Sequence, residues 1–206
     1  MRFSASNLAI ERGGRLLFSG LSFAVAGGSA LMVTGPNGAG KSSLLRALMG
    51  FLPLESGTVA LEGGDAERTI GEQAQYLGHA DALKGALTAG ENLSFWAGVL
   101  GGDPSRETIR DALARVGLAH AIDFPARALS AGQKRRAALA RLIVVHRPLW
   151  LLDEPAAALD AAAQEILAAI MRAHLQGGGI IVAAAHAPLG LDDAQELRLG
   201  ATAAAA

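Results

Sequence analysis

A ten-residue segment, TGPNGAGKSS (34–43), constrains the fold of this chain more than any other part of the sequence. It contains a glycine, four further residues and then Gly-Lys-Ser, which is the pattern of a loop that wraps phosphate groups with its backbone N–H groups. Such a loop lies between a strand and a helix. The apolar run ALMVTG (30–35) precedes it, and KSSLLRALMG (41–50) follows with helical spacing and a closing glycine. We therefore expect an α/β phosphate-loop fold, and not a glycine-rich turn without a ligand.

The residues of this loop have distinct expected roles. Its glycines let the backbone curl around a β-phosphate, Lys41 reaches the β- and γ-oxygens, and Ser42 can hold magnesium. The predicted nucleotide-binding residues are Gly35, Pro36, Asn37, Gly38, Ala39, Gly40, Lys41, Ser42 and Ser43.

Two adjacent carboxylates follow a second apolar run, LWLLDEP (149–155). Parallel sheets bind ligands at the carboxyl ends of their strands, so this pair is expected at the same site as the loop. Asp153 is the predicted magnesium partner, and Glu154 is placed to accept a proton from an attacking water. The alternative is an exposed acidic turn, which the wholly apolar strand disfavours. The same pair would also suit a kinase with a hydroxyl acceptor.

A third strand-like run, IIVAAAH (180–186), ends on His186. This position also falls at the carboxyl edge of a predicted strand, where a contact with a γ-phosphate becomes available. A single histidine at a strand end is more often structural than catalytic. Both interpretations stay open from the residues alone.

A second helix start with anion-binding potential occurs in ALSAGQKRRAALARL (128–142). Ser130 fits an N-cap, and Gln133 three residues later completes a capping box. A helix N-terminus also presents unpaired N–H groups and a positive dipole end, and can therefore bind an anion. The segment is thus either an ordinary helix start or a second phosphate site.

The remaining sequence predicts one domain that spans 1–206. A strand-rich beginning with a turn at Gly13-Gly14 gives way to helical patterns, of which one carries a capping box at Thr88 and Glu91. Strands and a crossover helix then return, which is typical of a parallel sheet. We expect a core over 1–80 and 147–200, which combines an N-terminal antiparallel part with a parallel sheet. A helical subdomain is expected over 81–146, and a tail without a fold of its own at 201–206.

Composition excludes several classes of function. The net charge is −1 and the one basic cluster is KRR (134–136), so nucleic acid is not an expected partner. Cysteine is absent, which excludes disulfides and thiolate chemistry. The N-terminus lacks the apolar segment of a secretion signal, and the longest apolar runs are much shorter than the ~20 residues that span a bilayer. A membrane role would therefore require partners.

In this order, the motifs resemble the ATP-binding-cassette family: phosphate loop, helical insertion, LSAGQ, LLDE and a closing histidine. The resemblance implies ATP, Mg²⁺ and a head-to-tail homodimer. In that dimer, the signature motif of one chain faces the γ-phosphate that the partner's phosphate loop holds. The signature residues here are Leu129, Ser130, Ala131, Gly132 and Gln133. Asp160 stands at the family's D-loop position, where Ala157 replaces the usual Ser or Thr; the alternative role of Asp160 is a helix N-cap.

Two positions depart from the family pattern. Where most members have the Q-loop glutamine, this chain reads QYLGHADALKG (75–85), which puts His79 or Ala80 there. Where an aromatic residue usually stacks on adenine, the candidates are Arg12 and, less favoured, Phe18. A guanidinium plane could stack on the base instead.

The segment YLGHADALKGALTAGENLSFWAG (76–98), together with HAPLGL (186–191), resembles the ATP-binding subunit of the cytochrome c maturation system, the haem exporter. That resemblance implies a peripheral protein on the cytoplasmic side of the bacterial inner membrane. It would work with integral membrane subunits, in particular haem exporter permeases, and drive haem delivery for c-type cytochromes. The alternatives are an ATPase subunit of another transporter and a soluble cassette protein acting as a nucleotide-switched binding module. A phosphate-loop kinase is disfavoured by LSAGQ.

Overall fold

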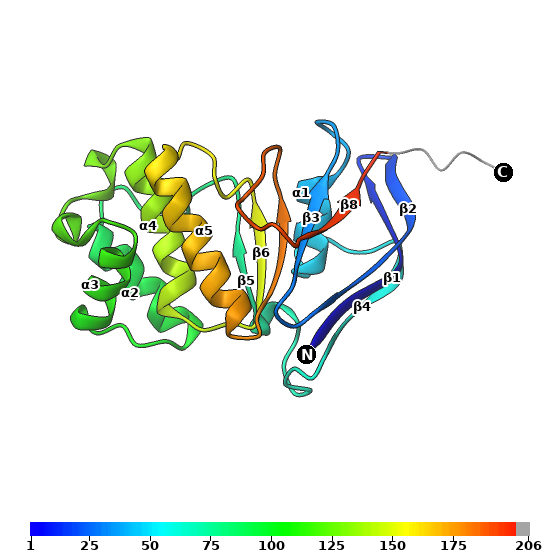
Figure 1. Cartoon of the computed structure of the whole chain (residues 1–206), viewed down its shortest axis with the longest axis horizontal. Coiled ribbons are helices and arrows are strands. Elements are labelled where there is room, and N and C mark those ends of the chain that lie inside the picture. Colours follow the sequence, from blue (N-terminus) through cyan, green and yellow to red (C-terminus); the bar gives the residue numbers. More distant parts are fainter. Residues whose placement is uncertain (201–206) are drawn as a thin grey trace. The chain divides into compact units, whose positions relative to one another are not determined.

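The computed structural model describes residues 1–200 (Figure 1). The chain forms two compact units. The first unit contains Met1–Gly78, Pro148–Glu154 and the chain from Met171 onward, and the second contains His79–Arg147 and Pro155–Ile170. Both units are therefore assembled from segments that are distant in sequence. The predicted tail at 201–206 lies outside the described residues.

The first unit begins with an antiparallel sheet in the order β2-β1-β4. Its strands are β1 (Arg2–Arg12), β2 (Arg15–Ala26) and β4 (Ser56–Glu62). The segment after the Gly13-Gly14 turn forms one strand, β2, which pairs with β1 through several register shifts. The expected antiparallel part is therefore present.

A parallel sheet in the order β5-β6-β7-β3-β8 forms the other layer of the first unit. Its strands are β5 (Ala74–Leu77), β6 (Leu149–Asp153), β7 (Ile180–Ala184), β3 (Ala30–Thr34) and β8 (Gln195–Arg198). All four strand pairs are parallel. Because β6, β7 and β3 are neighbours, the loops that follow them meet at one edge. The α/β prediction is confirmed.

Helix α1 (Lys41–Leu48) joins the two layers of the first unit. One buried cluster contains Phe3 and Leu8 of β1, Leu44 and Leu45 of α1, and Leu151 of β6. The helix ends as the sequence predicts, because Gly50 directly follows its cap with φ of 83°. This packing fixes the start of α1, and with it the glycine-rich loop.

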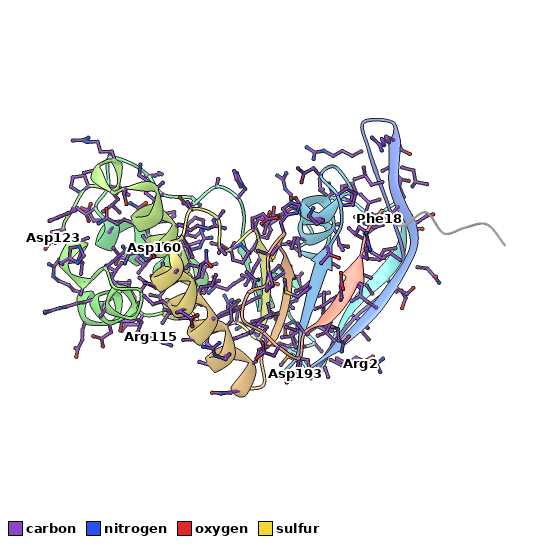
Figure 2. The ribbon with its side chains drawn as sticks, turned by 45° about the horizontal axis from the view of Figure 1, so that its top comes forward. Arg2, Phe18, Arg115, Asp123, Asp160 and Asp193 are labelled. Atoms are coloured by element: carbon purple, nitrogen blue, oxygen red, sulfur yellow. The ribbon has the colours of Figure 1, made fainter. Side chains whose placement is uncertain are left out.

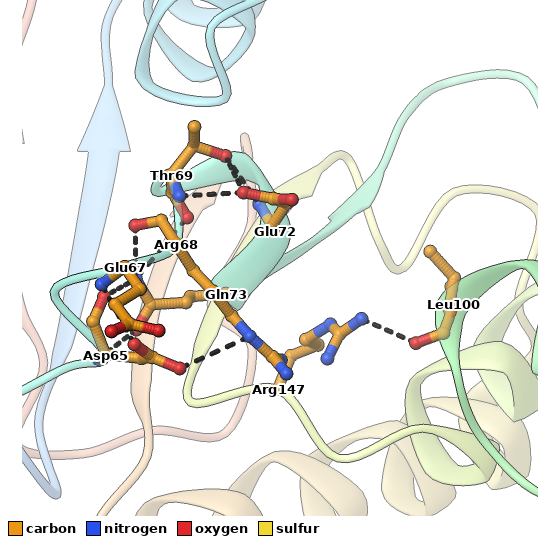
Figure 3. Close-up of polar contacts among 8 residues, drawn as sticks. All are labelled: Asp65, Glu67, Arg68, Thr69, Glu72, Gln73, Leu100 and Arg147. Atoms are coloured by element: carbon orange, nitrogen blue, oxygen red, sulfur yellow. Dashed lines mark hydrogen bonds and ion pairs between the residues drawn. The ribbon is translucent and has the colours of Figure 1, made fainter.

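Side-chain hydrogen bonds hold the irregular connection between β4 and β5. Buried Gln73 ends the short helix η1 (Gly71–Gln73). Its amide donates to the carbonyls of Asp65 at 2.9 Å and Arg68 at 3.0 Å, and its Oε1 accepts from the N–H of Asp65 (Figure 3). One side chain thus provides hydrogen-bond partners for backbone groups of a loop that has no strand pairing to supply them.

The second unit is helical (Figure 1). It contains α2 (Ala89–Leu100), α3 (Arg106–Arg115), η2 (Ala119–Ala121), η3 (Ala126–Ala128), α4 (Ala131–Val144) and most of α5 (Ala161–Gln176). Both predicted capping boxes are present, Thr88 with Glu91 and Ser130 with Gln133. Arg147 donates to the carbonyl of Leu100 and ties the end of α2 to the segment that follows α4 (Figure 3). Over residues 1–200, no helix is both long and apolar enough to cross a membrane.

Candidate active site

The glycine-rich loop follows β3 and leads directly into α1, as its sequence pattern requires. Gly35 has φ of 138°, a conformation that favours glycine. A Cβ at this position would lie 2.5 Å from the carbonyl oxygen of Leu199, so no side chain fits there. The loop shape is therefore set both by backbone conformation and by the chain that runs past it.

Lys41 is the first residue of α1 and is 8% exposed. Its ammonium donates to the carbonyls of Gly35 at 2.8 Å and Pro36 at 3.2 Å. The loop thus holds its own cation at the position where phosphate oxygens would offer negatively charged acceptors. This geometry supports the role predicted for Lys41.

Ser42 and Asp153 are brought together although they lie 111 residues apart. The Ser42 hydroxyl donates to Oδ1 of Asp153 at 3.0 Å, and Asp153 is the last residue of β6 and 5% exposed. A hydroxyl and a carboxylate are oxygen donors of the kind that Mg²⁺ prefers, and Mg²⁺ in nucleotide sites takes its other ligands from phosphates and waters. The pair therefore fits the predicted metal.

The sequence analysis did not identify Tyr76, which also contacts Asp153. Tyr76 lies on β5, in register with Leu151 of the neighbouring β6, and its hydroxyl is hydrogen-bonded to the Asp153 carboxylate. Burial, and next the negative charge of Asp153, raise the pKa of Tyr76 above its ordinary value. The phenol is therefore a neutral donor that orients this carboxylate. Only the pairing of β5 with β6 could have revealed it.

Glu154 has an unusual backbone for a non-glycine residue, with φ of 49°. Its N–H donates to the carbonyl of Ala184 at 2.8 Å, which ties it to the end of β7. Its Oε1 lies 3.5 Å from Nε2 of His186, and the His186 side chain is 55% exposed. The structure thus places Glu154 and His186, two of the three predicted catalytic residues with Lys41 as the third, beside each other at an open edge of the sheet.

One pocket of the first unit is lined by the loop, the two carboxylates and the histidine. Arg12 lines this pocket as well, whereas Phe18 packs against the hydrophobic core on β2 (Figure 2). The full lining comprises Arg12, Leu17, Asn37, Gly38, Gly40, Lys41, Ser42, Ser43, Asp153, Glu154 and His186. Most of the predicted loop residues, both carboxylates and His186 therefore line one cavity that suits a nucleotide polyphosphate.

The second unit carries the other predicted residues. Ser130 is exposed at the start of α4, and Leu129 before it is buried. Asp160 Oδ1 accepts from the N–H of Ala163 at 2.8 Å, so Asp160 caps α5, while its D-loop role stays a prediction (Figure 2). His79 and Ala80 are both exposed directly after β5, and the Q-loop assignment also stays a prediction.

Comparisons with known proteins agree with this fold. The sequence pattern that defines the ABC transporter family matches residues 18–157. A putative ABC transporter ATP-binding protein from Pyrococcus furiosus has the same fold, with a TM-score of 0.84, 21% identity, and coverage of 97% of this chain and 98% of that one. An Atm1-family ABC exporter with ATP bound gives a TM-score of 0.81 at 26% identity, covering 96% of this chain and 36% of that one. The chain belongs to the ABC transporter family and is an ATPase of that class.

Closer relatives are similar over nearly the whole chain. The cytochrome c biogenesis ATP-binding export protein CcmA of Nitrobacter winogradskyi is 59% identical over 203 residues, which cover 98% of this chain and 100% of the relative. The protein of the same name from Bradyrhizobium diazoefficiens is 54% identical with the same coverage. These relatives confirm the subfamily resemblance that the loop around His79 predicts.

Proposed function

We propose that this chain is the ATP-hydrolysing subunit of a transport complex that delivers haem for the assembly of c-type cytochromes. The observation that carries the proposal is the 59% identity to a cytochrome c biogenesis ATP-binding export protein along its full length. The pocket described above supplies the chemistry that such a subunit needs. ATP binds in this pocket of the first unit, where Lys41 is directed to the β- and γ-phosphates and Arg12 is available to stack on the base.

Hydrolysis joins a water oxygen to the γ-phosphorus and breaks the bond between that phosphorus and the β–γ bridging oxygen. Glu154 accepts the proton of the attacking water, and His186 contacts the γ-phosphate from the neighbouring strand end. Ser42 and Asp153 would hold Mg²⁺, which neutralises charge on the phosphates when bound. Their existing hydrogen bond supports this role, because it already sets a hydroxyl and a carboxylate beside each other.

A homodimer explains why one chain has two helix N-termini that can bind phosphate, one after the phosphate loop and one at LSAGQ. Ser130 is exposed at the N-terminus of a 14-residue helix, where the helix dipole and amide groups favour an anion. In the proposed arrangement, this motif completes the site of the partner chain, and Asp160 and His79 act as D-loop and Q-loop residues. The dimer would bind integral membrane subunits, haem exporter permeases, at the cytoplasmic side of a bacterial inner membrane.

Deletion of the gene tests the pathway. We expect mature c-type cytochromes to disappear from haem-stained gels while b-type haem spectra persist, because only c-type maturation would depend on this ATPase. The wild-type gene should restore the c-type bands, and a gene carrying Lys41→Ala should not. Normal c-type bands after deletion would overturn the pathway. Failure of Lys41→Ala to reduce ATP hydrolysis by the purified chain would instead overturn the site.

A further inference from the structure

We propose that Arg135 is a positioning residue for Glu154, acting through the carbonyl of Pro155. The inference rests on the proposed catalytic role of Glu154 and adds the residue that fixes where its carboxylate points. Arg135 lies in the second turn of α4, the helix that begins with the signature motif. No role is expected for it from the phosphate-binding motifs themselves.

The backbone at Glu154 needs support on both sides. A non-glycine residue in the left-handed region persists only where its surroundings determine that conformation. On the N-terminal side, the Glu154 N–H donates to the carbonyl of Ala184. On the C-terminal side, the next residue is Pro155. Because proline has no N–H, its carbonyl is the only backbone group through which a hydrogen bond can hold Pro155.

Arg135 holds that carbonyl. Its Nε donates to the oxygen of Pro155 at 3.2 Å, and its Nη1 lies 3.2 Å from Oδ1 of Asp81. The Arg135 side chain is 3% exposed, whereas that of Asp81 is 27% exposed. A buried guanidinium requires such partners, and its planar fork can satisfy both at once in a fixed geometry.

The surroundings keep Arg135 in place. Arg141, further along α4, lies over the ring of Trp96 at 4.7 Å. Burial lowers the pKa of Arg141 to about 10, with a smaller effect in the same direction from the nearby Arg135 charge. Two buried cations thus share Asp81 as an anion. The indole N–H of Trp96 donates to the carbonyl of Ala82 and fastens the segment that carries Asp81.

The first turn of α4 also lies close to the chain that follows Pro155. A Cβ added to Gly132 would lie 3.1 Å from the carbonyl oxygen of Ala158, so the first turn of α4 lies against this part of the chain. Residues 132 and 135 are three positions apart and therefore share one helix face. This face contacts the backbone on the C-terminal side of Glu154 at two points. Helix α4 thus holds Pro155, the residue covalently bonded to Glu154, with Arg135 as the polar attachment.

The main test is Arg135→Lys in the full-length chain. Lysine keeps the charge but lacks the planar guanidinium group, which donates to the Pro155 carbonyl and to the Asp81 carboxylate at the same time. We expect kcat for ATP to fall roughly 10- to 100-fold, as for other small misplacements of a catalytic group. Binding of a fluorescent ATP analogue should stay within about 2-fold, because the phosphate loop is untouched. A raised KM with unchanged kcat would overturn the proposal.

Arg136→Lys is the matched control, because Arg136 lies on the same helix and donates to the carbonyls of Val116 and Gly117 instead. It should keep its turnover. Circular dichroism and thermal melting identify any variant that does not fold. Asp81→Asn then provides a second test, because it removes the charge that anchors Arg135 and should also lower kcat without weakening nucleotide binding. Wild-type kcat in a folded Arg135→Lys or Asp81→Asn variant would overturn the inference.

A double-mutant cycle with Glu154→Gln separates this inference from the proposed function. If Arg135 acts only through Glu154, adding Arg135→Lys to Glu154→Gln should change single-turnover hydrolysis by less than about 2-fold. A further loss equal to that in the wild-type background would show a role that does not involve Glu154. Wild-type hydrolysis by Glu154→Gln alone would instead overturn the catalytic assignment on which the inference rests.

Discussion

The adjacent carboxylates Asp153 and Glu154 lie in different surroundings. Asp153 is buried and accepts hydrogen bonds from Ser42 and Tyr76, which hold its carboxylate in one orientation. Glu154 turns out of the strand through its positive φ and lies beside the exposed His186. These different surroundings, and not the residue type, support the proposed division in which Asp153 would hold a metal and Glu154 would accept a proton.

Glu154→Gln should bind ATP and barely hydrolyse it. The amide has almost the same shape as the carboxylate but cannot take a proton from water, so turnover falls by roughly 10² to 10⁴ while nucleotide binding persists. Because the nucleotide is not consumed, an ATP-dependent dimer should accumulate and be visible by light scattering. Glu107→Gln, an exposed change on α3, serves as the control. Hydrolysis at the wild-type rate would contradict a catalytic role for Glu154.

At the scale of elements, two helices of the second unit begin in nearly the same way. The Thr88 hydroxyl accepts from the Glu91 N–H at 3.0 Å, and the Ser130 hydroxyl accepts from the Gln133 N–H at 3.2 Å. In both helices, the side-chain oxygen of Glu91 or Gln133 in turn accepts a hydrogen bond from the N–H of the cap residue. Capping alone therefore does not distinguish a helix N-terminus with a purely structural role from one that also binds phosphate. That distinction rests on the surrounding LSAGQ motif.

Ser130→Ala and Thr88→Ala test this distinction as a matched pair. Each should lower the free energy of unfolding by about 1 kcal/mol, measured by urea titration, because each removes one cap. Only Ser130→Ala should also lower ATP turnover, by ~10²-fold, as expected for the loss of a donor aimed at phosphate. Equal turnover in the two variants would limit Ser130 to capping.

At the scale of the molecule, the two units divide the proposed chemistry. The first unit holds the phosphate loop, both carboxylates and His186, and the second holds the signature helix start. If the second unit of one chain completes the site of another, then no single chain has a closed site. Dimerisation would then be part of catalysis.

Tagged heterodimers with Lys41→Ala and Ser130→Arg test that arrangement. With both changes on one chain and a wild-type partner, completion in trans damages both sites, since one loses its lysine and the other its signature serine. With one change on each chain, both defects fall in a single site and the other stays intact. We therefore expect the split heterodimer to be the more active in ATPase assays. Higher activity with both changes on one chain would contradict the dimer.

The local features of this protein could be predicted from its sequence. The phosphate loop, the caps at Thr88 and Ser130, and the strands that end at Asp153 and near His186 depend on neighbouring residues, on backbone preferences and on apolar patterns. Their convergence at one edge also followed, because parallel strands bring their carboxyl ends together. The family motifs supplied the rest of that prediction.

Only the tertiary structure revealed the side chains that set the orientation of these groups. Tyr76 contacts Asp153 because β5 pairs with β6, and Arg135 contacts Pro155 because α4 packs along the segment after Glu154. Neither residue has a sequence pattern that indicates its partner. Contacts between residues distant in sequence depend on which surfaces pack together, and a local pattern carries no information on that choice.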